Sequence, residues 1–232
     1  MLTKVVEPSD LKINQINEMY ELMSESYDNL NYKKFLTDLR EKDHVILLYD
    51  DEVIYGFSTY KIVTLDYYGE SISGIFSGDT IVHSSQAMSL GLQRTFSKVV
   101  KKYMDELGSI YWFLVCKGHK TYRYLSLYTS EYYPNFNKDT PSKEREIMNL
   151  YAEKLYGDAY DRKLGIIKNT GSNDFVKSGV SDADEKALRK KEAQFFIEKN
   201  PGYVNGDELV CIAEFKPENM RTAFYKMVDS DD

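Results

Sequence analysis

Residues 86–116, QAMSLGLQRTFSKVVKKYMDELGSIYWFLVC, decide the fold class of this chain. Their first two thirds carry apolar residues three and four positions apart, which predicts a long amphipathic helix over Gln86 to Leu107 that Gly108 ends. Ile110 to Cys116 follows as an almost wholly apolar run, which is typical of a strand buried on both faces. The helix must therefore pack on a sheet, and the run after it belongs in the interior of that sheet.

Three strands are predicted before the long helix, at Val45–Tyr49, Val53–Leu65 and Ser71–His83. Asp50-Asp51 joins the first two strands and Gly69-Glu70 joins the last two, so the three form an antiparallel meander. The third strand and the strand at 110–116 flank the helix. We expect these two strands to be parallel, because a helix that connects neighbouring strands makes a right-handed crossover.

Further helices are expected on both sides of this region. Ser9 is expected to cap a first helix, a second covers Tyr32–Arg40, and a tyrosine-rich helix runs from His119 to Tyr132 until Pro134 stops it. The remaining segments are predicted as a helix from Pro141 to Tyr156, a strand within Leu164–Lys168, a charged helix from a Ser181/Asp184 capping box to Lys199, a strand at Glu208–Phe215 and a final helix from Pro217.

Composition excludes several classes of protein. The 232 residues include 30 Lys and Arg against 37 Asp and Glu, a formal charge of −7, so we expect no nucleic acid partner. Two cysteines, Cys116 and Cys211, are too few for a disulfide scaffold, and Met1 to Asp10 lack the pattern of a signal peptide. No apolar stretch approaches the roughly 20 residues that span a bilayer, so we expect a cytoplasmic protein with no membrane partner.

The order of elements resembles that of the Gcn5-related N-acetyltransferase superfamily. That family carries a loop of pattern Gln/Arg-x-x-Gly-x-Gly/Ala before its long helix, and Gln86-Ala87-Met88-Ser89-Leu90-Gly91 lies in the matching place, with Ser89 for the first glycine. The resemblance is good over Leu11 to Phe136 and looser beyond. It implies an α/β fold with a mixed, mainly antiparallel central sheet and flanking helices, in a single domain over 1–232. Residues 1–136 would form the acyl-CoA-binding core, and 137–232 would complete the sheet and the acceptor side.

The resemblance also implies a binding site for acetyl-CoA or another acyl-CoA. The pyrophosphate would lie on the loop at the start of the long helix, where unpaired backbone N–H groups favour an anion without a basic surface. The pantetheine arm would lie between the two parallel strands, and backbone N–H groups near Val82 would polarise the thioester. The implied cofactor-binding residues are Ile81, Val82, His83, Gln86, Ala87, Met88, Ser89, Leu90 and Gly91. The alternative for this region is that Ser84 or Ser85 caps a helix that packs in the core and binds no cofactor.

Three residues are candidates for the chemistry. Tyr128 matches a family tyrosine that protonates the leaving thiolate, although it could also serve only to pack. Asp79 and His83 are candidate bases for the attacking ammonium, and both should point to one face of their strand. The structural alternatives are that Asp79 satisfies a neighbouring backbone group and that His83 ends the strand.

The resulting hypothesis is an acyl-CoA-dependent N-acyltransferase that transfers an acetyl group directly to an amine on a small molecule or a protein. The main alternative is a catalytically inactive binding or regulatory module of the same fold, which Ser89 favours. A thiol enzyme using Cys116 is the third hypothesis. We expect no metal, since Cys116 and His119 lack further ligands at zinc-module spacing. A homodimer is left open.

Overall fold

The computed structural model describes residues 1–83, 86–169, 171, 175–177 and 188–230, with the side chains of 86–89 excepted. Strands in this part of the chain form an eight-stranded sheet and a separate two-stranded one. In spatial order the large sheet consists of β1 (Leu2–Val6), β3 (His44–Asp50), β4 (Val53–Tyr67), β5 (Glu70–Val82), β6 (Ile110–Cys116), β10 (Glu208–Phe215), β8 (Ile166–Ile167) and β7 (Tyr160–Asp161). Among the strands that the structure describes in this sheet, only the β5–β6 pair is parallel, so the predicted meander, the parallel pair and the mixed fold class are confirmed.

The N-terminus differs from the prediction. Residues 2–6 form the edge strand β1, which pairs antiparallel with β3 from Leu2↔Tyr49 to Val6↔Val45. Ser9 lies in a 3₁₀ turn and caps no helix, because the first helix, α1 (Ile13–Ser26), begins after Lys12. The short strand is stabilised by the free edge of β3, a partner that the local sequence does not reveal.

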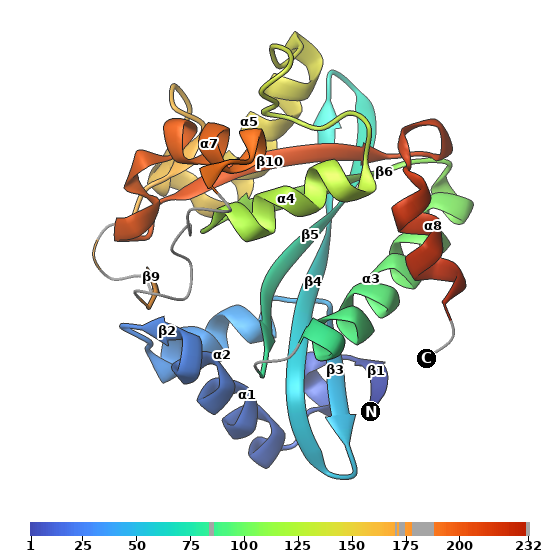
Figure 1. Cartoon of the computed structure of the whole chain (residues 1–232), viewed down its shortest axis with the longest axis vertical. Helices are drawn as coiled ribbons and strands as arrows, with labels where there is room; N and C mark the ends of the chain where they lie inside the picture. Colours follow the sequence, from blue (N-terminus) through green and yellow to red (C-terminus); the bar gives the residue numbers. More distant parts are fainter. Residues whose placement is uncertain (84–85, 170, 172–174, 178–187, 231–232) are drawn as a thin grey trace.

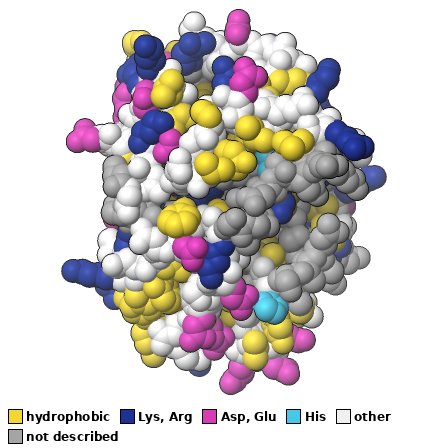
Figure 2. Space-filling view, turned by 60° about the vertical axis from the view of Figure 1, so that its left-hand side comes forward, with side chains coloured by type: hydrophobic (Ala, Val, Ile, Leu, Met, Phe, Trp, Pro, Cys, Tyr) yellow, Lys and Arg dark blue, Asp and Glu magenta, His cyan; other side chains and the backbone are white. Residues whose placement is uncertain are grey.

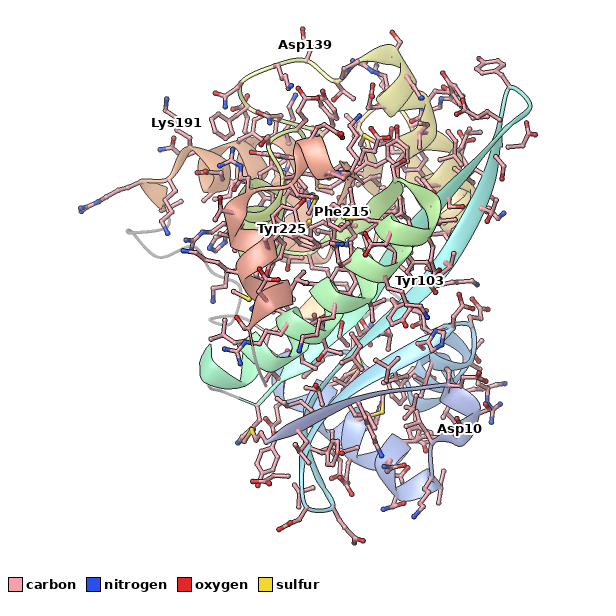
Figure 3. All side chains as sticks on the ribbon, turned by 90° about the vertical axis from the view of Figure 1, so that its right-hand side faces the viewer. Asp10, Tyr103, Asp139, Lys191, Phe215 and Tyr225 are labelled. Atoms are coloured by element: carbon pink, nitrogen blue, oxygen red, sulfur yellow. The ribbon has the colours of Figure 1, made fainter. Side chains whose placement is uncertain are left out.

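Helices cover both faces of the large sheet (Figure 1). One face packs against α3 (Gln86–Leu107), α4 (His119–Tyr128), α7 (Lys191–Lys199) and α8 (Thr222–Asp229). The other face packs against α1, α2 (Tyr32–Arg40) and α5 (Ser142–Tyr156). Figure 3 shows α8 lying beside α3 on the first face. The predicted bounds of α2 and α3 agree with the structure.

The tyrosine-rich helix is shorter than predicted. It ends at Tyr128, because Thr129 and Tyr133 bridge to Met220 and Ile212 and the chain turns into extended backbone. The buried side chain of Asn219 fixes this segment. Tertiary hydrogen bonds therefore override the local helical preference of residues 129–132.

The C-terminal part adds three strands, β10, β8 and β7, to the large sheet. β10 pairs antiparallel with β6 from Leu209↔Cys116 to Phe215↔Ile110, so β6 lies between two strands. Pro217 opens a 3₁₀ turn and not the last helix, and Pro141 is the residue before α5. The Ser181/Asp184 capping box lies outside the described residues.

A two-stranded sheet links the C-terminal part to the N-terminal helices. β2 (Tyr27–Asp28) pairs with β9 (Phe175–Val176), and the Lys177 N–H donates to the Ser26 carbonyl. Figure 1 shows this pair at the edge of the molecule between α2 and the C-terminal elements. None of the helices described is long and apolar enough to cross a membrane.

Candidate active site

The parallel strands β5 and β6 part near the centre of the sheet. Their ladder runs from Gly74↔Tyr111 to Ser77↔Leu114, whereas β5 continues to Val82 and β6 to Cys116. Past Ser77, the described part of β6 offers β5 no further ladder partner. Beyond Ser77, one edge of β5 therefore has no strand neighbour among the described residues.

An irregularity in β5 lies at the point of parting. Ser58 pairs with Thr80 and Tyr60 with Ser77, so two residues, Gly78 and Asp79, lie opposite Thr59. Such a bulge bends its strand and increases the local twist. A Cβ atom at Gly78 would overlap the Thr59 hydroxyl and the Lys42 side chain, so glycine is required for this close approach.

A cavity of about 620 Å³ occupies the gap between the strands. Leu114 and Val115 line it from β6, and Asp79, Thr80 and Val82 line it from β5. It continues to both faces of the sheet: the α3–α4 side contributes Leu92, Gln93, Phe96, Tyr124 and Tyr128, and the α1–α2–α5 side contributes Tyr27, Phe35, Lys42, Phe76 and Tyr156. Its size is within the range of small-molecule sites.

The surface carries charges of both signs. On the face shown in Figure 2, acidic and basic side chains are interspersed with apolar ones.

Within the cavity, Lys42 is buried and its Nζ lies 2.5 Å from the Asp38 carboxylate. Lys117 lies 3.9 Å from Glu208 at another part of the wall. Two of the carboxylates that line the cavity therefore already face a cation of the same chain.

The backbone of Val82 faces the gap. The His83 N–H donates to the Tyr55 carbonyl at 2.8 Å, and hydrogen bonding alternates along an antiparallel pair. The N–H and carbonyl of Val82 therefore point away from β4. The close approach of Gly56 to Val82, where a Cβ on Gly56 would lie 3.2 Å from the Val82 Cα, agrees with a pair that makes no ladder bond.

Asp79 and His83 were expected on one face of β5, and the bulge at Gly78 and Asp79 interrupts the strand period between them. Ile81, between them, packs in the cluster that contains α1 side chains, whereas Val82 packs in the cluster of α3. Asp79 lines the cavity. His83 is half-exposed, and its Nδ1 lies 2.9 Å from the Glu25 carboxylate on α1, outside the cavity lining. The structure therefore separates the two candidate bases.

Two tyrosines and a glutamine form a hydrogen-bonded group on the opposite wall. The Tyr128 hydroxyl donates to Gln93 Oε1 at 2.7 Å, and Gln93 Nε2 donates to the Tyr124 hydroxyl at 3.2 Å. Burial, and to a lesser extent Tyr124, raises the pKa of Tyr128. Sequence reasoning singled out Tyr128 and missed Gln93 and Tyr124. The available signal was a polar Gln93 between Leu92 and Phe96 on the apolar stripe of the long helix.

The cysteines do not form a nucleophilic site. Cys116 and Cys211 are free and fully buried, with sulfur atoms 3.8 Å apart. Burial, followed by the hydrogen bond with Cys211, raises the pKa of Cys116, which disfavours the thiolate. In the part of the chain that the structure describes, no group of three or more His, Cys, Asp or Glu residues could hold a metal ion.

The predicted pyrophosphate loop is the first part of α3. Its residues 86–91 are helical, and the side chains of Gln86, Ala87, Met88 and Ser89 lie outside what the structure describes. Gly91 faces the sheet, where an added Cβ would lie 3.0 Å from Leu48 Cδ1. The binding roles of residues 86–91 stay predictions.

The fold and the cavity define an α/β protein whose mainly antiparallel sheet parts between two parallel strands. No protein-family model and no curated protein matched the chain. Three solved structures that are similar to it are Escherichia coli ElaA, an aminoglycoside 6'-acetyltransferase of type Ii, and a GCN5-related N-acetyltransferase from Kribbella flavida.

These similarities are distant. ElaA is 17% identical, with 58% of this chain and 93% of ElaA covered and a TM-score of 0.39. For the aminoglycoside acetyltransferase the identity is 15%, the covered shares are 60% and 90%, and the TM-score is 0.42. For the Kribbella protein the identity is 12%, the shares are 56% and 34%, and the TM-score is 0.41.

Proposed function

We propose that this chain is an acyl-CoA-dependent N-acyltransferase that transfers an acyl group, acetyl in the simplest case, directly from the thioester to an amine. The observation that carries the proposal is the parting of β5 and β6 around a cavity that reaches both faces of the sheet. Such a gap allows a thioester to approach from one face and an amine from the other.

The pantetheine arm suits the open edge of β5. It is an extended chain with two amides, and an unpaired strand edge offers N–H and carbonyl groups at matching intervals. The N–H of Val82 faces this gap and is the proposed donor to the thioester oxygen, where charge develops during attack. The first turn of α3, at residues 86–89, supplies backbone N–H groups for the pyrophosphate.

Asp79 is the proposed base on the acceptor side. It sits in the bulge and lines the cavity beside the gap. In the reaction it accepts a proton from the substrate ammonium, and the amine nitrogen then attacks the thioester carbon. The C–N bond forms and the C–S bond breaks. The acylated nitrogen releases its second proton to water, and the leaving thiolate takes a proton from a tyrosine of α4. Holding both substrates in the gap supplies rate through positioning.

The acceptor side favours a small amine with an apolar body. Phe35, Phe76 and Tyr156 line it, and the Phe76 and Tyr156 rings meet edge to face at 6.2 Å. Because Asp38 and Glu208 already face Lys42 and Lys117, a polycation would gain little there. A protein amine is the alternative acceptor, and the cytoplasm is the proposed location.

The test is an assay of purified protein with acetyl-CoA, a panel of amines and detection of the released CoA thiol. We expect release that depends on an arylalkylamine, an amine on an aromatic body, and mass spectrometry of the product should show the acetylated amine. Asp79→Asn should reduce kcat/KM about 10²-fold or more with acetyl-CoA affinity retained. Binding of acetyl-CoA without turnover of any amine would favour the inactive binding module.

A further inference from the structure

We propose that Tyr124, and not Tyr128, gives the proton to the leaving thiolate, with Gln93 and Tyr128 as positioning residues. This inference rests on the proposed acyl transfer and names a catalytic residue for it. It follows from the directions of two hydrogen bonds on the wall of the cavity that α3 and α4 form.

The hydroxyl proton of Tyr128 already takes part in a hydrogen bond within the protein. Its hydroxyl donates to Gln93 Oε1 at 2.7 Å, which is a short and therefore strong hydrogen bond. An amide oxygen can only accept, so the Tyr128 proton must leave this bond before it can reach a ligand. Tyr128 is also 3% exposed and packed against Trp112 and Phe224, with ring centroids 6.5 and 6.2 Å away. These contacts hold it in place.

The proton of Tyr124 is available to a ligand. Its oxygen accepts from Gln93 Nε2 at 3.2 Å, so the bond with the glutamine uses a lone pair and leaves the O–H for another acceptor. No acceptor for this O–H is found among the residues that the structure describes. Tyr124 is half-buried and lines the cavity.

The three groups form one directed chain of donors. Donation runs from Tyr128 to Gln93 and from Gln93 to Tyr124, and each bond polarises the next. The chain ends at Tyr124, whose O–H becomes a better donor for a negative sulfur. Stacking of the two tyrosine rings, with centroids 6.0 Å apart, keeps the hydroxyls on the same side of α4.

The proton balance of the step is simple. When the C–S bond breaks, the electron pair stays on sulfur as a thiolate. Tyr124 gives its proton to that sulfur and becomes a phenolate, which accepts a hydrogen bond from Gln93 Nε2. The acylated nitrogen releases its second proton to water, and the phenolate takes one proton back from water, so that the two exchanges balance. Burial raises the pKa of Tyr124, so the hydroxyl carries its proton before the reaction.

The first test needs no acceptor substrate. Free CoA is bound to the protein and its thiol is titrated through the ultraviolet absorbance of the thiolate. If Tyr124 donates to sulfur, the bound thiol has a lower pKa than free CoA. Tyr124→Phe should then raise the pKa of the bound thiol by about one unit, a tenfold change in thiolate population, because a hydrogen bond to a charged group is lost. Tyr128→Phe is the matched control and should change it far less.

Gln93→Glu tests the direction of the chain. A carboxylate accepts from both tyrosines, so it draws the Tyr124 proton toward position 93 and away from sulfur. We expect the pKa of the bound thiol to rise as in Tyr124→Phe, while the urea midpoint of the variant stays near that of the wild type. In turnover, Tyr124→Phe should lower kcat by about 10²-fold or more with KM for acetyl-CoA unchanged, and Tyr128→Phe should lower it by less than tenfold.

Two results separate the inference from the proposed function. If CoA binds and Tyr128→Phe, not Tyr124→Phe, raises the pKa of its thiol, the donor is Tyr128 and the inference is wrong, although acyl transfer stands. If neither CoA nor acetyl-CoA binds the wild-type protein, the proposed function fails and the inference fails with it.

Discussion

Gly78 is the residue that most directly fixes the geometry of the gap. It sits in the bulge where β5 leaves β6, and its missing side chain lets Lys42 and Thr59 pack directly on the backbone. We expect Gly78→Ala to destabilise the fold by about 1–3 kcal/mol, the usual cost of overpacking. Urea unfolding measures this change.

Gly91→Ala is the matched control for Gly78→Ala. There an added Cβ meets the ends of the Leu48 and Thr3 side chains, at 3.0 and 3.5 Å, and alanine favours a helix by about 1 kcal/mol over glycine. We expect little net change in stability. Equal losses in the two variants would show that the bulge imposes no special requirement at position 78.

Asn219 holds the end of α4 against the end of β10. Its side chain accepts from the Glu131 N–H at 2.7 Å and donates to the carbonyls of Glu131 and Glu214 at 2.9 and 2.7 Å. Asn219→Ala should destabilise the protein by about 2–4 kcal/mol, because it also leaves buried partners unsatisfied. Asn137→Ala, at an exposed position, should change the unfolding free energy by less than about 0.5 kcal/mol. A loss in Asn219→Ala as small as the control's would contradict this role.

Single residues of the site were predictable only where a motif or a strand period marked them. Tyr128 and Asp79 were predicted by position, and both line the cavity. Gln93 and Lys42 were not, since their roles depend on which side chains meet across α3, α4 and the bulge. Pair contacts of this kind leave no regular spacing in the sequence.

Among the elements, long periodic segments were predicted well and short ones were not. The spacing of apolar residues in α3 and the apolar run of β6 follow from burial of these segments, so they can be recognised in the local sequence. The edge strand β1 and the two-residue strand β8 owe their form to partners far along the chain, β3 and β10. Such pairing is a tertiary effect that periodicity does not report.

The open edge of β5 predicts that the backbone N–H of Val82 contacts the bound acyl-CoA. Val82→Pro removes the N–H that faces the gap, and the ladder with β4 does not use that group. We expect the variant to fold and to bind acetyl-CoA at least tenfold more weakly, as measured by calorimetry. Val82→Ala keeps the N–H and should bind normally. Undiminished binding in a folded Val82→Pro would exclude this N–H as a contact.

The abundance of buried tyrosine affects the stability of the whole molecule at alkaline pH. Burial raises the pKa of Tyr160 to about 12 and raises that of other tyrosines further. The latter are Tyr60, Tyr111, Tyr122, Tyr128 and Tyr151. Above pH about 10 the unfolded chain loses phenolic protons that the folded chain keeps, so the unfolding free energy falls as pH rises.

We expect the urea midpoint to be the same at neutral pH and at about pH 9, and to decline steeply above about pH 10. Tyr111→Phe removes one of these groups and should make the decline shallower. A midpoint that stays level to pH about 11 would contradict the burial of these phenols.

Thermal unfolding of the whole chain with acetyl-CoA tests most directly whether the parted sheet holds an acyl-CoA. Ligand at about 100 times its dissociation constant adds roughly 2.7 kcal/mol to stability, which should raise the midpoint by about 5–10 °C for a chain of this size. Desulfo-CoA, which keeps both pantetheine amides, should give a comparable shift, and adenosine alone a small one. No shift with acetyl-CoA or with a longer acyl-CoA would contradict the assignment of the gap between β5 and β6 as an acyl-CoA site.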